Sequence, residues 1–286
     1  MMRVMISQVM VNGLVSGFVY ALTAAGFSLL YGNANILFLA IGEIYMLGAI
    51  TFYALVAEAG LPYFVAMLLV VLAMGVLGVI LERFLFRPLK GSDLTFAFAT
   101  LALGMLIAGI ALALFGERGK GLPEVFPGRL KALGIVVPYD KIVIVGLALA
   151  ILLGFHFYFK RTKTGRAIRA VSQDAEAAKL MGVDINRIKG LTFFLALAVA
   201  GAGGALVTPL YYADVFMGGP VLMTTLMVVV LGGLGSFPGA IYGGLLIGLL
   251  ESFGYTFIGG ITIIILFCVV IGLLIFRPQG LLGGEQ

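Results

Sequence analysis

The sequence predicts an all-α polytopic membrane protein, and three observations support this fold class. Hydrophobic residues make up 62% of the 286 residues, charged residues make up only 11%, and the mean hydropathy is +1.18. These values lie far outside the range of soluble domains. The apolar stretches are continuous instead of alternating, which favours membrane helices over the strands of a membrane barrel. Several stretches reach the length of about 20 residues that a helix needs to cross a bilayer.

Five uncharged stretches are each predicted to form one membrane-spanning helix: 59–81, 94–116, 142–159, 190–213 and 252–276. Two longer uncharged runs, 4–42 and 215–250, are too long for one span and too short for two. We expect each of these runs to break, to fold back or to hold short helices. The chain is therefore predicted to form one transmembrane domain, 1–286, with about eight or nine membrane-embedded helices, some short or re-entrant.

Basic residues in the short loops predict the orientation of the bundle. The loop 83–90 holds three Lys or Arg residues and the loop 160–189 holds eight, and two predicted spans separate these loops. Both loops therefore lie on one face, and the positive-inside rule makes that face cytoplasmic. Arg277, after the last predicted span, agrees with this orientation. The segment 116–141 then lies outside, as an ordered loop that contains three prolines.

The charged loop 160–190 also carries signals for short helices. Ser172 is predicted to cap one helix, with Asp174 and Glu176 in its first turn, where the helix macrodipole favours acidic residues. Gly182 stands where the end of this helix needs a residue in the left-handed conformation.

A second short helix is predicted directly after that glycine. Asp184 can cap it, and the helix would cover 185–189 before the next span begins. The loop would then consist of two short helices joined by a glycine elbow and tied to the membrane bundle at both ends, a form that transmits force. An ordinary positive-inside loop would account for the basic residues, but for neither the caps nor the elbow.

Acidic residues inside membrane segments are costly, so they are treated as functional hypotheses. Glu43 follows Gly42 and lies near Asn35 and Tyr45, in a region where glycine and asparagine could leave the backbone unwound along a cavity. Two interpretations of Glu43 stay open: a role in a translocation pathway or its gate, and a buried structural hydrogen bond.

Two further polar residues are candidates for the same pathway. Glu251 lies between two apolar runs, and it can instead mark an extracytoplasmic helix end. Asn12 lies in the first predicted span, where a single asparagine often serves helix packing. The candidate pathway residues are therefore Asn12, Asn35, Glu43, Tyr45 and Glu251.

A glycine-rich segment near the end of the chain predicts a tight turn. Its candidate turn residues are Gly232, Gly233, Gly235, Pro238 and Gly239. The segment lacks the Lys-Ser/Thr of a P-loop, so it is not a nucleotide-binding loop. We expect a re-entrant or interhelical turn.

The residues give little support to an enzyme, and no catalytic residue is predicted. His156 is the single histidine and Cys268 the single cysteine, so no His/Cys/carboxylate cluster predicts a metal site. An intramembrane enzyme would need a Ser/His pair, paired aspartates or a His-rich site. Two transport classes stay open: a permease driven by separate ATPase subunits, and a secondary transporter or channel for a small polar solute. Only the first gives a reason for the capped elbow.

The elbow resembles a known motif. Glu176-Ala177-Ala178-x-x-x-Gly182 is similar to the EAA loop of ABC-importer permeases. In that family the loop forms a coupling helix that sits in a cleft of the ATPase subunit. The resemblance assigns these four residues to ATPase coupling.

Other segments resemble one branch of these permeases. The stretches 20–26, 42–48 and 231–240, together with the end 278–283, are similar to the LivH-type branched-chain amino-acid permeases. The resemblance covers nearly the whole chain. One departure is 37–41, which reads Leu-Phe-Leu-Ala-Ile where that family often has Asn-Phe-Ala-His before its Gly-Glu.

The resemblance implies a permease subunit of an ATP-driven importer for branched-chain amino acids or related small polar solutes. It implies a multi-pass protein of the cell inner membrane that binds no cofactor itself, with ATP and Mg on two partner ATPase subunits. The other implied partners are a second permease subunit, a paralogue or a second copy, and an extracytoplasmic solute-binding protein. The chain would contact the lipid bilayer and no nucleic acid.

Overall fold

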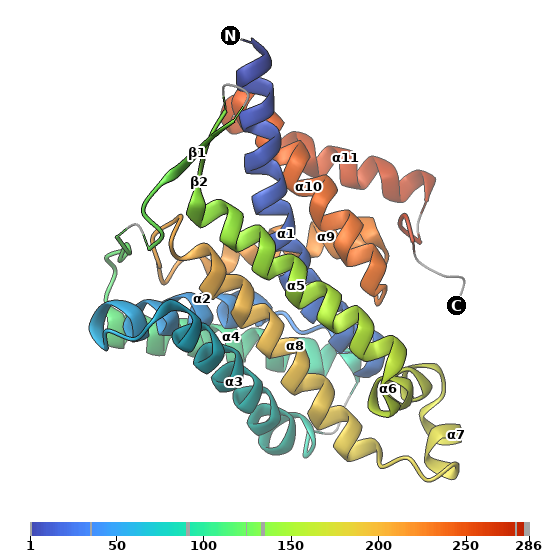
Figure 1. Cartoon of the computed structure of the whole chain (residues 1–286). Helices are drawn as coiled ribbons and strands as arrows, with labels where there is room; N and C mark the ends of the chain where they lie inside the picture. Colours follow the sequence, from blue (N-terminus) through green and yellow to red (C-terminus); the bar gives the residue numbers. More distant parts are fainter. Residues whose placement is uncertain are drawn as a thin grey trace.

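The computed structural model (Figure 1) describes residues 2–34, 36–89, 92–123, 125–132, 135–277 and 279–282. Over these residues the chain is almost entirely helical, which confirms the predicted all-α class. The helices are α1 (Met2–Ala34), α2 (Ile41–Tyr53), α3 (Tyr63–Leu81), α4 (Asp93–Phe115), α5 (Tyr139–Arg161), α6 (Lys163–Gln173), α7 (Ala175–Leu180), α8 (Ile185–Val207), α9 (Gly218–Gly232), α10 (Phe237–Phe257) and α11 (Thr262–Phe276). Strands β1 (Arg129–Ala132) and β2 (Ile135–Pro138) pair antiparallel, with Arg129 opposite Pro138.

Eight of the described helices are long and apolar enough to cross a membrane. A π-helical turn, Ala54–Glu58, extends α2, and a second, Glu82–Phe86, extends α3. Helix α9, with 15 residues, is apolar but shorter than a full span. The predicted number of membrane-embedded helices, including short ones, is therefore confirmed.

Both of the long uncharged runs contain a break, as predicted. In the first run, α1 forms one helix of 33 residues, and the break comes only afterwards, at 36–40. Thr100 of α4 supports this non-helical backbone, because its Oγ1 accepts from the Leu39 N–H at 3.1 Å. Its single hydrogen lies between the Leu37 oxygen at 3.0 Å and the Ala97 oxygen of its own helix at 2.8 Å. Irregular backbone at membrane depth needs such partners from the protein. In the second run, the chain turns between α9 and α10.

Small residues hold the centre of the bundle together. Helix α1 packs along α8 and α10, and α8 also packs against α2 and α3. A Cβ atom built on Gly204 of α8 would overlap the Tyr45 carbonyl oxygen of α2, and one on Gly244 of α10 would lie 2.7 Å from the Ala21 Cα of α1. Close backbone approach through small residues is the usual basis of helix packing in membranes. By contrast, α5 and α11 are the least buried spans, each with only 17% of its apolar stretch buried.

The two ends of the bundle differ in character (Figure 1). Helices α6 and α7 project at one end, here called the α7 end, and the β-hairpin lies at the other, the hairpin end. Arg87 Nη2 donates to the Asn186 oxygen at 3.4 Å, so the loop 83–90 reaches the base of α8 at the α7 end. The two basic loops therefore share one end, as their charges predict.

Candidate functional site

The projecting α6–α7 segment begins with a capped break. Asp174 has an extended backbone conformation, and its Oδ1 accepts the N–H groups of Glu176 and Ala177, each at 2.9 Å. The cap predicted at Ser172 is wrong. Ser172 belongs to the last turn of α6, and its hydroxyl donates to the Arg169 oxygen at 2.8 Å. Buried Val171 holds this turn of α6 against the core, so the break falls at the next capping residue.

The elbow after α7 has the left-handed glycine that its sequence predicts. Gly182 has φ +85°, its N–H donates to the Lys179 oxygen at 3.0 Å, and the Val183 N–H donates to the Ala178 oxygen at 3.1 Å. Asp184 Oδ1 then accepts the N–H of Asn186 at 3.1 Å and caps the next helix.

The second short helix predicted at 185–189 is wrong. These residues are the first turn of α8, which runs without interruption to Val207. Gly190 does not break the helix, because that stretch already packs beside the end of α3, with Glu82 near Gly190. The elbow is therefore joined directly to the most central span of the bundle.

The tip of the elbow presents apolar side chains that nothing in the described chain covers. Leu180 is 89% exposed and Met181 is 85% exposed. Of the residues that resemble the coupling motif, Ala178 is buried, whereas Glu176 and Ala177 are exposed. Exposed apolar side chains grouped on a charged loop are typical of a protein docking surface.

An ion pair that sequence reasoning did not single out holds the base of α8. Arg87 Nε and Nη2 reach the two carboxylate oxygens of buried Glu82 at 3.1 and 2.8 Å. This contact with Glu82 raises the pKa of Arg87. Bidentate Arg–carboxylate pairs fix geometry as well as charge. An open groove of about 770 Å³ beside the pair is lined by Asp184 and Arg187 as well.

Glu43 lies where two helices begin. It sits in the first turn of α2, and its carboxylate lies between Gly104 of α4 and Gly218, the first residue of α9. A Cβ atom on either glycine would come within 3.2 Å of a Glu43 carboxylate oxygen, so the glycines make the space that the carboxylate fills. Oε2 is buried, and no described residue offers it a hydrogen bond.

The structure separates Glu43 from one of the other pathway candidates, Tyr45. Tyr45 is only 2% exposed and packs against Gly203 and Gly204 of α8, away from the Glu43 carboxylate. Asn35 lies outside the described residues.

The remaining two candidates, Asn12 and Glu251, meet in a cavity of about 470 Å³ near the hairpin end. Lys141 of α5 joins them there, and its Nζ donates to Asn12 Oδ1 at 2.6 Å. The Tyr20 hydroxyl is close enough to the Glu251 carboxylate to interact electrostatically. Glu251 Oε2 is buried without a hydrogen-bond partner among the described residues. This polar cavity is called the outer cavity below.

Sequence reasoning did not place Lys141 in the pathway, because it stands at the end of a charged loop and reads as a surface cation. The outer cavity holds a carboxylate, an ammonium group, an amide and several hydroxyl groups, and its apolar wall includes Val15 and Leu210. Such a mixture can hold a small molecule that carries both charges.

The α9–α10 turn is built from the five residues that the sequence singles out. Gly233 and Gly235 have φ values of +106° and +78°, which side chains rarely adopt. Gly232 and Gly239 pack backbone against backbone, where a Cβ atom on either would overlap the other. Pro238 stands in the first turn of α10.

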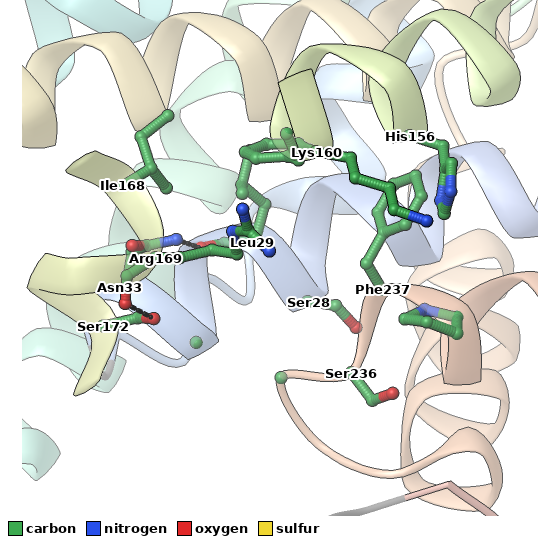
Figure 2. A pocket seen from close by; sticks show the side chains of 14 residues that line it. Ser28, Leu29, Asn33, His156, Lys160, Ile168, Arg169, Ser172, Ser236 and Phe237 are labelled. Atoms are coloured by element: carbon green, nitrogen blue, oxygen red, sulfur yellow. Dashed lines mark hydrogen bonds between the residues drawn. The ribbon is translucent and has the colours of Figure 1, made fainter. Parts of the chain in front are cut away.

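A second cavity of about 470 Å³ opens beside this turn, between it and helices α1, α5 and α6. Figure 2 shows the side chains around it, which include Lys160, Arg169 and His156. It is called the inner cavity below. Within the described part of the chain, no group of three His, Cys, Asp or Glu side chains could hold a metal ion.

Comparisons with known proteins agree with this architecture. The family model described as "Branched-chain amino acid transport system / permease component" matches residues 9–277. The permease protein BraD of a high-affinity branched-chain amino acid transport system of Pseudomonas aeruginosa is 32% identical, over 98% of this chain and 96% of the relative. LivH of Escherichia coli K12 is 28% identical over the same shares, and a probable LivH of Methanocaldococcus jannaschii is 24% identical over 92% of this chain and 88% of its own. No solved structure gives a significant match.

A family match over residues 9–277, with a relative of 32% identity along nearly the whole chain, leaves little of the sequence outside the alignment. The matched family and the relatives are membrane permease components, not enzymes. The chain therefore belongs to the family of branched-chain amino acid transport system permease components.

Proposed function

We propose that this chain, as one transmembrane domain, is the permease subunit of an ATP-driven ABC importer in the cell inner membrane, with branched-chain amino acids or related small polar solutes as its cargo. The names of its relatives support the cargo. The observation that supports an ATP-driven importer is the capped elbow at Gly182, with exposed Leu180 and Met181 at its tip. A secondary transporter or channel would have no use for such a surface.

The elbow supplies the coupling step. Two ATPase subunits, which hold ATP and Mg, receive α7 with Glu176, Ala177 and Ala178 near its start. Movement of α7 passes through Gly182 into α8, which is continuous from Ile185 to Val207. Gly204 of α8 in turn lies directly on the backbone of Tyr45 in α2. A movement of the elbow is thus transmitted to α2, the helix whose first turn holds Glu43.

The remaining partners are assigned from the difference between the two ends of the molecule. The α7 end faces the cytoplasm, because the basic loops gather there. An extracytoplasmic solute-binding protein then delivers its cargo at the hairpin end, near the outer cavity. A second permease subunit, a paralogue or a second copy, completes the pathway.

The outer cavity gives this pathway a first recognition site for an amino acid. The Glu251 carboxylate is suited to the substrate ammonium group, and the Lys141 ammonium to the substrate carboxylate. Lys141 has Asn12 as its hydrogen-bond partner, and no carboxylate within the described residues is paired with it. Val15 and Leu210 are placed to contact an aliphatic side chain.

Replacing Gly182 with valine tests the coupling step. A β-branched residue in the left-handed conformation is strained by about 1–2 kcal/mol, so the elbow should shift and uptake should fall several-fold. Gly60→Val is a matched control, because Gly60 also has a positive φ, +67°, and open space around it, but lies away from the α7 end. Uptake and substrate-stimulated ATP hydrolysis are measured in reconstituted vesicles. Equal loss in both variants would contradict the coupling role.

Replacing Glu251 with glutamine tests the outer cavity. Loss of a charged partner for the ammonium group should raise the KM for leucine uptake about tenfold, with little change in the maximal rate. Glu58→Gln is the control, since Glu58 is exposed near the same end and pairs with Lys120 at 3.1 Å. An unchanged KM in the Glu251 variant would remove this cavity from the substrate pathway.

A further inference from the structure

The inner cavity concentrates positive charge at the α7 end. Lys160 comes from the last turn of α5, and His156 lies one helical turn before it. Arg169 approaches from α6, and Figure 2 shows it on the far side of Leu29 from Lys160. None of the described residues that line the cavity is acidic. The cations here therefore have no anionic partner inside the cavity.

A buried hydroxyl group lines the same space without a partner. Ser28 of α1 is only 1% exposed, and its Oγ has no hydrogen-bond partner among the described residues. Serine in a helix commonly bonds the carbonyl oxygen one turn back, and Ser28 does not. Buried polar groups are rarely left unsatisfied. The Ser28 hydroxyl is therefore available to donate to a ligand.

The start of α10 adds further donors. Ser236 caps this helix of 21 residues, with its Oγ accepting the Gly239 N–H at 3.1 Å, and the Ser236 hydroxyl hydrogen is left for another acceptor. Figure 2 shows Ser236 and Ser28 around the same opening. The N-terminus of a long helix favours anions, and the phosphate group above all.

The rest of the wall is apolar. Phe159 and Phe237, with ring centroids 6.0 Å apart, line the cavity together with Leu29 and Ile168. Helix α5, which carries Phe159, is one of the least covered spans, so the cavity opens beside a surface that the described residues leave uncovered. A soluble anion gains nothing from such a wall, whereas an acyl chain does.

We propose that the inner cavity binds the phosphate group of an anionic phospholipid from the leaflet at the α7 end. Lys160 and Arg169 face the phosphate charge, Ser28 and Ser236 donate to its oxygens, and the aromatic wall holds the upper acyl chain. Basic pockets between membrane helices on the cytoplasmic side are suited to such head groups. The bound lipid would connect α6, the base of the coupling segment, to the α9–α10 turn.

Lipid binding to the purified, delipidated full-length chain tests this proposal by native mass spectrometry. The chain is titrated with phosphatidylglycerol and, separately, with zwitterionic phosphatidylcholine. Lys160→Gln together with Arg169→Gln should weaken phosphatidylglycerol binding about 25-fold, about fivefold for each cation. The matched control is Arg161→Gln with Lys163→Gln, which removes the same charge at the same end from residues that do not line the cavity. The control should bind phosphatidylglycerol as the unmodified chain does.

A second variant separates ligand binding from folding. Ser28→Ala should fold normally, because it removes a hydroxyl that has no partner, and should still weaken phosphatidylglycerol binding several-fold. A folded Ser28→Ala variant that binds phosphatidylglycerol as tightly as the unmodified chain would overturn the role of Ser28 and of the site.

The source of the phosphate is decided by competition. Millimolar inorganic phosphate should not displace phosphatidylglycerol. Displacement that depends on Lys160 and Arg169 would support the phosphate chemistry but overturn the lipid as its source. Equal weakening of lipid binding in the cavity variant and in the control variant would overturn the proposal, because it would show attraction to general surface charge only.

Discussion

Replacing Gly204 with alanine is expected to destabilise the bundle strongly, because the added methyl group has no room at the crossing of α8 and α2. Gly204 of α8 faces the backbone of α2, and a Cβ atom on it would overlap the Tyr45 carbonyl oxygen and lie 3.0 Å from the Ala49 nitrogen. Backbone atoms cannot move aside as the end of a side chain can. The two helices must separate, which also loosens the contacts of α8 with α1 and α3.

The expected size of the Gly204→Ala effect is about 3 kcal/mol or more, at the upper end of the range for overpacked cores. Gly146→Ala provides the control. Gly146 lies within α5 with no atom within 4 Å of an added Cβ, so alanine there should be neutral or stabilising. Melting temperature and the yield of monodisperse protein in detergent measure both variants. Equal stability of the two variants would mean that α2 and α8 do not cross as closely as the structure shows.

Features that depend on neighbours along the chain could be predicted from the sequence. Gly182 and Asp184 satisfy backbone groups only two or three residues away, so their roles follow from residue type and spacing alone. The choice between Ser172 and Asp174 could not be made in this way, since both are good capping residues. It depends on the packing of Val171, which keeps α6 helical as far as Gln173.

Features that depend on distant parts of the chain could not be predicted. Asn12, Lys141 and Glu251 are each separated by more than a hundred residues, and only the packing of α1, α5 and α10 brings them into one cavity. Likewise, a break within the run 4–42 could be expected from the length of that run, but its partner Thr100 lies within an apolar span and reads there as a minor polar residue. Local patterns thus predict the helices and the elbow, whereas the polar sites need the fold.

Replacing Glu43 with glutamine should reduce uptake about a hundredfold while the transporter assembles and folds normally. The change keeps the size of the side chain, so the space between Gly104 and Gly218 stays filled. No described residue donates to Oε2, and the amide therefore breaks no hydrogen bond at that atom. If the solute passes here, what is lost is the negative charge beside the starts of α2 and α9, and a charged hydrogen bond to a solute contributes about 1.5–3 kcal/mol.

The measurement combines melting temperature with uptake per assembled complex in one reconstituted preparation of the Glu43→Gln variant. Glu117→Gln is the control, because Glu117 is an exposed residue just beyond the end of α4, and its loss should change neither quantity. A Glu43 variant that melts markedly lower and transports normally per folded complex would assign the carboxylate to structure. A variant that is normal in both respects would show that the membrane region tolerates this charge without using it, and Glu43 would no longer be a pathway candidate.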